Sequence, residues 1–293
     1  MRPLPLDPAT YRERRATAAR ICAEHHGRVP LLVLGVDDAT LQSGLTPIAS
    51  RPRQDAWFDW FTGCREPDAA LLVEPGTHAH DTLFLPRRDP RREAWEGPRA
   101  VPGPDAQRHF AVDATAASDE LKRRVRDAAD RCGGQIAVIA KGQGFQSRAA
   151  SLWRSRLRGI RVIDVGAQLI PCRMVKTPAE IALHRRAVRI TAAGLKAVLP
   201  RIPHLRREAE IASALVAHYL APASDPLAFP PIVAAGANAA TLHYPHNDQP
   251  LVKRGCILLD TGASWQGYCA DVTRTVPQHG RFDDARLREV YEL

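Results

Sequence analysis

Two aspartates, Asp260 and Asp271, are the residues of this chain whose setting most clearly suggests chemistry. Each lies within an apolar, β-prone run, at 255–262 and 269–275, and a turn-like segment of Gly, Ser and Gln residues separates the two runs. This pattern predicts a β-hairpin. If the loop consists of Trp265 and Gln266, Asp260 pairs directly with Asp271 across the two strands.

Two carboxylates placed in this way favour a bound cation. Directly opposed side chains lie about 5 Å apart, where like charges repel each other. A divalent metal ion between them would remove that repulsion. A bulge at Gly267 would instead shift the register by one residue and put the carboxylates on opposite faces. The competing interpretation is a pair of solvated aspartates on an edge hairpin, because two aspartates alone are not a metal motif.

The residues around both aspartates help to decide between a cation site and a pair of solvated carboxylates. This stretch contains Thr241-Leu242-His243-Tyr244, then Asn247, Ile-Leu-Leu-Asp-Thr-Gly-Ala at 257–263, Gly267-Tyr268 and Ala-Asp-Val-Thr-Arg-Thr at 270–275. In this order the motifs resemble the pita-bread metallopeptidases, and among them the Xaa-Pro aminopeptidases of the aminopeptidase P family. The Asp-x-Gly and Asp-x-Thr-Arg-Thr elements after Leu-His-Tyr are specific to that superfamily.

The resemblance implies an enzyme that removes the N-terminal residue from peptides with proline in second position. Such enzymes use two divalent ions, usually manganese (Mn²⁺), held by five side chains, a role that suits hard oxygen and imidazole donors. Asp260 and Asp271 match the first two ligands. His243 matches a histidine that contacts the substrate and assists proton movement, in a pH range where imidazole titrates. A lone histidine is otherwise commonly structural.

The remaining ligands of the family, one histidine and two glutamates, belong to motifs downstream of residue 293. The last residues also predict a helix, because Asp283 and Asp284 precede an apolar stripe at Leu287, Val290 and Tyr291. No capping residue follows. We therefore expect a truncated chain that has little or no peptidase activity by itself.

Two domains are expected to position these residues. In 1–170, buried-strand patterns at 30–35, 69–74, 82–85, 135–140 and 161–165 alternate with helical patterns, which predicts an α/β domain with a mixed sheet. The motifs Arg-Gln-Asp at 53–55 and Asp-Pro-Arg-Arg-Glu-Ala-Trp-Glu-Gly-Pro-Arg at 89–99 resemble the creatinase-type N-terminal domain of the same family. Residues 168–177 are predicted to be a linker, and 171–293 to be the first part of an α+β pita-bread domain.

Composition excludes several other classes of protein. The formal charge is +9, but the basic residues are scattered and no nucleic-acid motif accompanies them, so no nucleic-acid partner is expected. No run reaches membrane-spanning length and no signal peptide is evident, so we expect a cytoplasmic protein without membrane contact. The six cysteines form no Cys-x-x-Cys pair, which argues against a zinc site. The family resemblance further implies a homo-oligomer.

Two alternatives differ from the aminopeptidase interpretation. A related enzyme would be an Xaa-Pro dipeptidase (prolidase) or an amidinohydrolase of the creatinase type on the same fold. A different class would be a non-catalytic, peptidase-like module that binds peptides or proteins, because a fold does not determine a function. Such a module would need no metal, whereas the aminopeptidase would.

Overall fold

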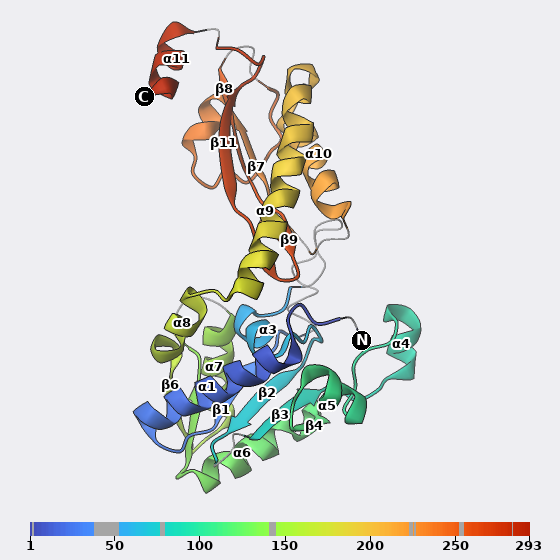
Figure 1. The fold of residues 1–293 in the computed structure, drawn as a ribbon, viewed down its shortest axis with the longest axis vertical. Coiled ribbons are helices and arrows are strands. Elements are labelled where there is room, and N and C mark those ends of the chain that lie inside the picture. The colour runs from blue at the N-terminus through green and yellow to red at the C-terminus, as the bar shows by residue number, and fades with distance from the viewer. Residues whose placement is uncertain are drawn as a thin grey trace. The chain divides into compact units, whose positions relative to one another are not determined.

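In the computed structural model the chain forms two compact units (Figure 1). The residues that the structure describes are 1, 3–37, 53–76, 80–140, 145–222, 225, 227–251, 255–282 and 284–293. Among them, the N-terminal unit extends to Lys176 and the C-terminal unit begins at Thr177. Asp283, which we expected at the start of the last helix, lies outside the described residues.

The N-terminal unit is built on a six-stranded mixed sheet with the strand order β4-β3-β2-β1-β5-β6. Strand β1 pairs antiparallel with β2 and parallel with β5. The strands are β1 (Leu31–Leu34), β2 (Ala70–Glu74), β3 (His80–Leu85), β4 (Ala114–Ala117), β5 (Gln135–Val138) and β6 (Arg161–Asp164). The mixed sheet that the sequence predicted for this half is confirmed.

Helices cover both faces of this sheet. Alternate side chains of β1 show this, because Leu31 and Val33 belong to one buried cluster and Leu32 and Leu34 to another. The first cluster includes residues of α1 (Pro8–His26), α3 (Ala56–Thr62), α5 (Pro104–Phe110) and α8 (Gly166–Met174). The second includes residues of α6 (Leu121–Arg131) and α7 (Phe145–Arg156). A further helix, α4 (Pro90–Glu96), buries no residue.

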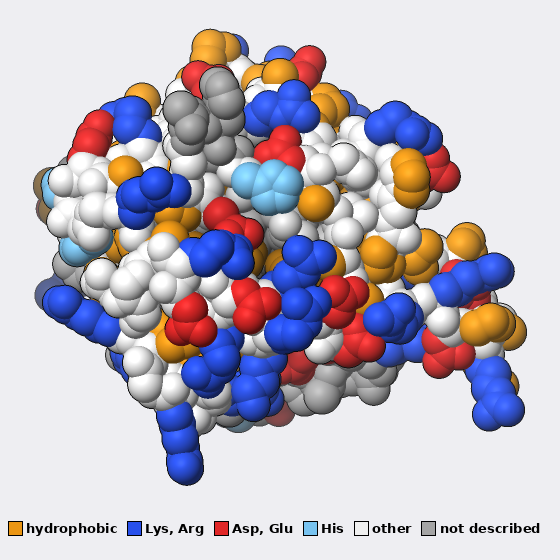
Figure 2. Space-filling model, turned by 90° about the horizontal axis from the view of Figure 1, so that it is seen from below, with side chains coloured by type: hydrophobic (Ala, Val, Ile, Leu, Met, Phe, Trp, Pro, Cys, Tyr) orange, Lys and Arg blue, Asp and Glu red, His pale blue; other side chains and the backbone are white. Residues whose placement is uncertain are grey.

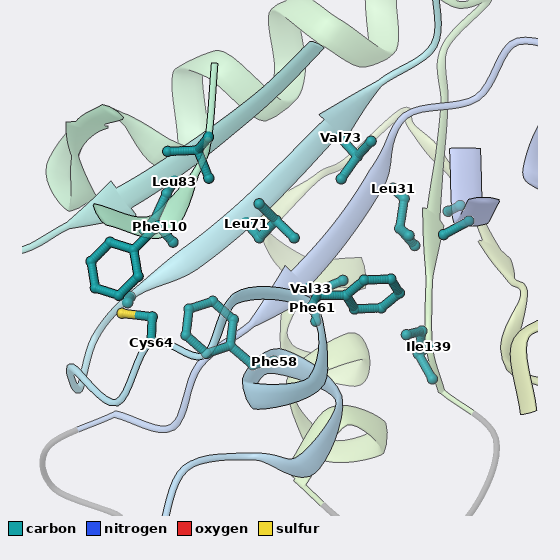
Figure 3. Close-up of a cluster of buried hydrophobic side chains, with 14 of the residues drawn as sticks. Leu31, Val33, Phe58, Phe61, Cys64, Leu71, Val73, Leu83, Phe110 and Ile139 are labelled. Atoms are coloured by element: carbon teal, nitrogen blue, oxygen red, sulfur yellow. The ribbon is translucent and has the colours of Figure 1, made fainter. Parts of the chain in front are cut away.

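The aromatic cluster of α3 and a buried ion pair stabilise the first of these layers. Phe58 and Phe61 are fully buried against the strands, as Figure 3 shows. Arg15 of α1, 1% exposed, donates through Nε to Asp81 Oδ2 of β3 at 2.5 Å and through a second nitrogen to the carbonyl oxygen of Phe61 at 2.9 Å. One guanidinium therefore joins α1, α3 and β3.

The predicted linker at 168–177 is mostly helical, so that prediction was wrong. Helix α8 spans Gly166–Met174 and contains Pro171, and the boundary that we predicted at 170/171 falls within it. Leu169 is 1% exposed and packs in the core of the N-terminal unit. Tertiary packing thus outweighs the helix-breaking tendency of the proline.

Charged side chains on the surface are interleaved by sign. Figure 2 shows one face on which Lys and Arg side chains alternate with Asp and Glu. Several form ion pairs in the N-terminal unit, among them Arg87 with Asp119 and Arg88 with Glu93. Among the described residues, no helix is long and apolar enough to cross a membrane.

The C-terminal unit packs two helices on one face of a three-stranded antiparallel sheet, β11-β8-β7. Helix α9 begins with a reciprocal capping box that Thr177 and Glu180 form. The elements in order are α9 (Pro178–Val198), η2 (Leu199–His204), α10 (Glu208–Leu220), β7 (Ile232–Ala235), η3 (Gly236–Ala240), β8 (Cys256–Thr261), β9 (Ser264–Trp265), β10 (Tyr268–Cys269), β11 (Val272–Pro277) and α11 (Ala285–Glu292).

Candidate metal centre

The predicted hairpin is present, but its turn lies one residue later than predicted. Trp265 pairs with Tyr268, so the two loop residues are Gln266 and Gly267. Both have positive φ, 51° and 87°, as the type I′ turn of two-residue hairpins requires. The same register continues into β8 and β11, where Asp260 pairs with Thr273. No bulge at Gly267 shifts the strands.

Asp260 and Asp271 are therefore diagonal neighbours, and the predicted direct pairing was wrong. Asp271 lies two residues before Thr273, the partner of Asp260, so the two aspartates share one face of the hairpin. Diagonal side chains are still within reach of each other. Partial desolvation of its carboxyl group raises the pKa of Asp271, and the charge of Asp260 and a hydrogen bond with it raise that pKa further. The structure thus brings the two carboxyl groups together by a different register.

The immediate surroundings orient these carboxylates. Asp260 is half-buried on β8 and accepts a hydrogen bond from Thr273 Oγ1 at 2.9 Å. Asp271 is exposed. Gly262 follows Asp260 by two residues, just after the end of β8, and a Cβ atom there would lie 1.9 Å from the carbonyl oxygen of Ala270. Only glycine allows the two segments of the hairpin to approach this closely just before Asp271.

The chemistry of this pair suits a divalent cation. Carboxylate oxygens are hard donors of the kind that Mn²⁺ and similar ions prefer, and a cation between them would offset the repulsion that helps to raise the pKa of Asp271. Across the described residues, no group of three or more His, Cys, Asp or Glu side chains could hold a metal ion. A metal site that used Asp260 and Asp271 would therefore need further ligands beyond those that the described residues bring together.

His243 lies in the segment that follows η3, and its side chain is exposed. Its neighbour Tyr244 is buried, and Asn247 holds the same segment against β7. Asn247 Oδ1 accepts from the Val233 amide at 2.7 Å, and its Nδ2 donates to the Pro231 carbonyl oxygen at 2.6 Å. The histidine thus lies in a segment whose flanking residues are fixed.

One residue near this segment was missed by the sequence analysis. Glu208, the first residue of α10, is 0% exposed. It accepts hydrogen bonds from Tyr244 Oη at 3.0 Å and from the Gln249 amide at 3.1 Å. An acidic residue in the first turn of a helix is ordinarily a helix-start signal, and the sequence alone does not show that this one is buried.

Comparison with known families agrees with this architecture. The aminopeptidase P N-terminal domain family matches residues 11–137, and metallopeptidase family M24 matches residues 182–293. The chain belongs to the aminopeptidase P group of the M24 metallopeptidases. This confirms the resemblance and the fold class that the sequence suggested, an aminopeptidase P-type α/β domain followed by residues of the pita-bread domain. A divalent metal is the cofactor expected of a metallopeptidase family.

Curated relatives include probable Xaa-Pro aminopeptidases of two fungi. The protein from Coccidioides posadasii is 30% identical over 291 residues, which cover 96% of this chain and 58% of the relative. The protein from Talaromyces marneffei is 32% identical over 247 residues, 82% of this chain and 51% of the relative. The chain spans about half the length of the curated relatives it matches.

Solved structures show the same fold. A histidine-to-alanine variant of Escherichia coli aminopeptidase P superposes with a TM-score of 0.80 at 25% identity, and covers 98% of this chain and 66% of its own. Proline aminopeptidase P II from Yersinia pestis gives a TM-score of 0.79 at 26% identity with the same coverage. Each of the two units thus has a fold found in aminopeptidase P.

Proposed function

We propose that this chain contributes to a metal-dependent Xaa-Pro aminopeptidase, which hydrolyses the bond between an N-terminal residue and a proline in second position. The observation that carries the proposal is the pair of acidic side chains on one face of the β8–β11 hairpin, in a chain of metallopeptidase family M24. Curated relatives named as probable Xaa-Pro aminopeptidases support the choice of substrate.

Asp260 and Asp271 are the proposed metal ligands, and Mn²⁺ is the proposed ion. When bound, a divalent metal polarises the scissile carbonyl group and lowers the pKa of the attacking water. Thr273 Oγ1 holds one oxygen of Asp260 by its hydrogen bond, which leaves the second oxygen for the metal. Because Gly262 has no side chain, the backbone passes close to the Ala270 carbonyl group, which fixes the position of the backbone just before Asp271.

His243 is the proposed residue that contacts the peptide and moves a proton. Its exposed side chain can meet a substrate from solvent, and a neutral imidazole can accept a proton near neutral pH. A homo-oligomer in the cytoplasm is the proposed form of the protein, by resemblance to the family.

Calorimetric titration of the 293-residue chain with Mn²⁺ tests the proposal. We expect binding that is lost in Asp260→Asn and in Asp271→Asn, both of which keep the size of the side chain and remove its charge. Glu289→Gln on the exposed α11 is the matched control and should bind as the wild type does. Absence of Mn²⁺ binding by the wild-type chain would contradict the proposal.

Cleavage assays give the second part of the test. In any longer product of the same gene, both aspartate variants and His243→Ala should abolish release of the first residue from an Xaa-Pro tripeptide. A non-catalytic module would instead bind that peptide equally well with and without a chelator. Cleavage of an Xaa-Pro dipeptide in preference to the tripeptide would indicate a dipeptidase.

A further inference from the structure

Glu208 is a fully buried carboxylate whose two oxygens are each engaged twice. Oε1 accepts from the Ala235 amide at 2.8 Å and from Asn238 Nδ2 at 3.0 Å. Oε2 accepts from Tyr244 Oη at 3.0 Å and from the Gln249 amide at 3.1 Å. A buried carboxylate is stable only when its charge is satisfied in this way.

All four donors come from one continuous segment, residues 235–249, and that segment carries His243. Tyr244 follows the histidine directly, and Asn238 precedes it by five residues. Asn238 Nδ2 is also 3.2 Å from Tyr244 Oη, so the two side chains and the carboxylate form a closed triangle. The histidine lies on the part of the chain that bridges two corners of this triangle.

The anchoring extends to the strand that bears Asp260. Ala235, the first donor, is the last residue of β7. Strand β7 pairs with β8, with Ile232 opposite Asp260. Glu208 thus holds the histidine-bearing segment at the end of β7, the strand that pairs with the Asp260-bearing strand β8.

Tyr244 acts in this network as a fixed donor. Burial raises the pKa of Tyr244 to about 12, with a further contribution from its hydrogen bond to Glu208. The phenol therefore stays protonated at neutral pH and continues to donate.

We propose that Glu208 is a positioning residue that sets the direction of His243 by holding Asn238 and Tyr244 on either side of it. The importance of that direction rests on the proposed function, but the placement itself does not. Glu210, on the same helix, offers a contrast, because it is exposed and accepts only from the amides of Arg206 and Arg207. It caps the helix and touches no residue of 235–249 through these bonds.

The test compares Glu208→Gln with Glu210→Gln in the 293-residue chain by NMR. In Glu208→Gln an amide NH₂ replaces one acceptor oxygen and faces a donor, so one pair of bonds is lost. We expect the His243 ring signals to shift. We also expect the one amide that loses its acceptor oxygen, that of Ala235 or that of Gln249, to exchange about tenfold faster, which corresponds to the loss of one charge-assisted hydrogen bond. The amides of α9 and β8 should keep their protection. Glu210→Gln should leave the His243 signals unchanged.

Two results would overturn the proposal: His243 signals in Glu208→Gln that superimpose on those of the wild type, or a uniform loss of protection across the C-terminal unit. If Glu208→Gln does not fold, Tyr244→Phe serves instead, because it leaves the carboxylate three donors and removes only the two hydrogen bonds of the Tyr244 hydroxyl group, beside His243. The His243 signals should then move while Ala235 and Gln249 stay protected, and unmoved signals would contradict the role. None of these measurements requires metal binding or peptidase activity, so they stand even if the proposed function fails.

Discussion

The two sheets of this chain differ in how they are covered, and that difference explains where chemistry can be placed. Every residue of β1 in the N-terminal unit is buried, because helices pack on both faces of its sheet. In the C-terminal unit, β8 alternates between buried and half-buried residues, since α9 and α10 pack on one face. Asp260 lies on the half-buried face. A strand covered on one side can therefore hold a carboxylate firmly without burying its charge.

The largest effect is expected from breaking the buried ion pair of the N-terminal unit. Arg15→Ala leaves Asp81, 4% exposed, as an uncompensated buried charge, which should cost about 3–5 kcal/mol of the free energy of unfolding. Denaturant unfolding measures this. Arg20→Ala removes an exposed pair with Glu24 and should change stability by less than about 1 kcal/mol. Equal effects of the two substitutions would show that the buried pair is not structural.

The two faces of β8 can be compared directly. Leu259→Ala on the helix-covered face removes a side chain that is 0% exposed and should cost about 2–5 kcal/mol. Leu258→Ala, on the half-buried face that also bears Asp260, should cost clearly less. Thermal unfolding of both variants sharpens the comparison, and a larger loss from Leu258→Ala would reverse our assignment of the faces.

Gly262→Ala should affect the site more than the fold. The added Cβ would meet the Ala270 carbonyl oxygen at 1.9 Å, so the backbone before Asp271 must move away. We expect Mn²⁺ affinity to fall severalfold, as measured by calorimetry, with both units still folded by circular dichroism. Gly280→Ala, just after β11, meets open space around its Cβ but strains a backbone with φ of 72°. It should leave Mn²⁺ affinity unchanged, because it does not push the backbone before Asp271. Unaltered affinity in Gly262→Ala would show that close approach here does not matter.

The smallest effect concerns the charge repulsion between Asp260 and Asp271. The raised pKa of Asp271 means that the folded chain binds more protons than the unfolded chain, so this group lowers stability as pH rises from the ordinary aspartate pKa through its own raised pKa. Asp260→Asn removes the repelling charge and should therefore restore part of the lost stability at pH values above the raised pKa of Asp271. A chelator keeps metal ions out of the measurement. The gain should be less than about 1 kcal/mol because Asp271 is exposed. Asn at 260 can still accept from Thr273 Oγ1.

Unfolding curves at several pH values test this expectation. The gain in stability of Asp260→Asn over the wild type should grow with pH and then level off, and Mn²⁺ should stabilise the wild type but not the variant. A gain that is independent of pH would mean that the two carboxyl groups do not interact.

Much of the architecture was visible in local patterns. The buried strands predicted at 30–35 and 135–140 depend on nearby residues, and the structure has strands there at Leu31–Leu34 and Gln135–Val138. The hairpin register was missed because it depends on which two loop residues adopt positive φ, and Gln266 gave no strong signal for that. Helix α8 was missed because Leu169 is buried by residues distant in sequence. Glu208 was missed for the same reason, since its four donors lie 27 or more residues away.

The central claim is that the carboxylates of Asp260 and Asp271 share one cation, and carboxyl-detected NMR during a Mn²⁺ titration tests it most directly. Paramagnetic broadening should reach the signals of Asp260 and Asp271 together and before those of any other carboxyl group, and it should disappear from Asp271 in Asp260→Asn. Broadening of only one of the two, or of exposed carboxylates elsewhere first, would contradict the account.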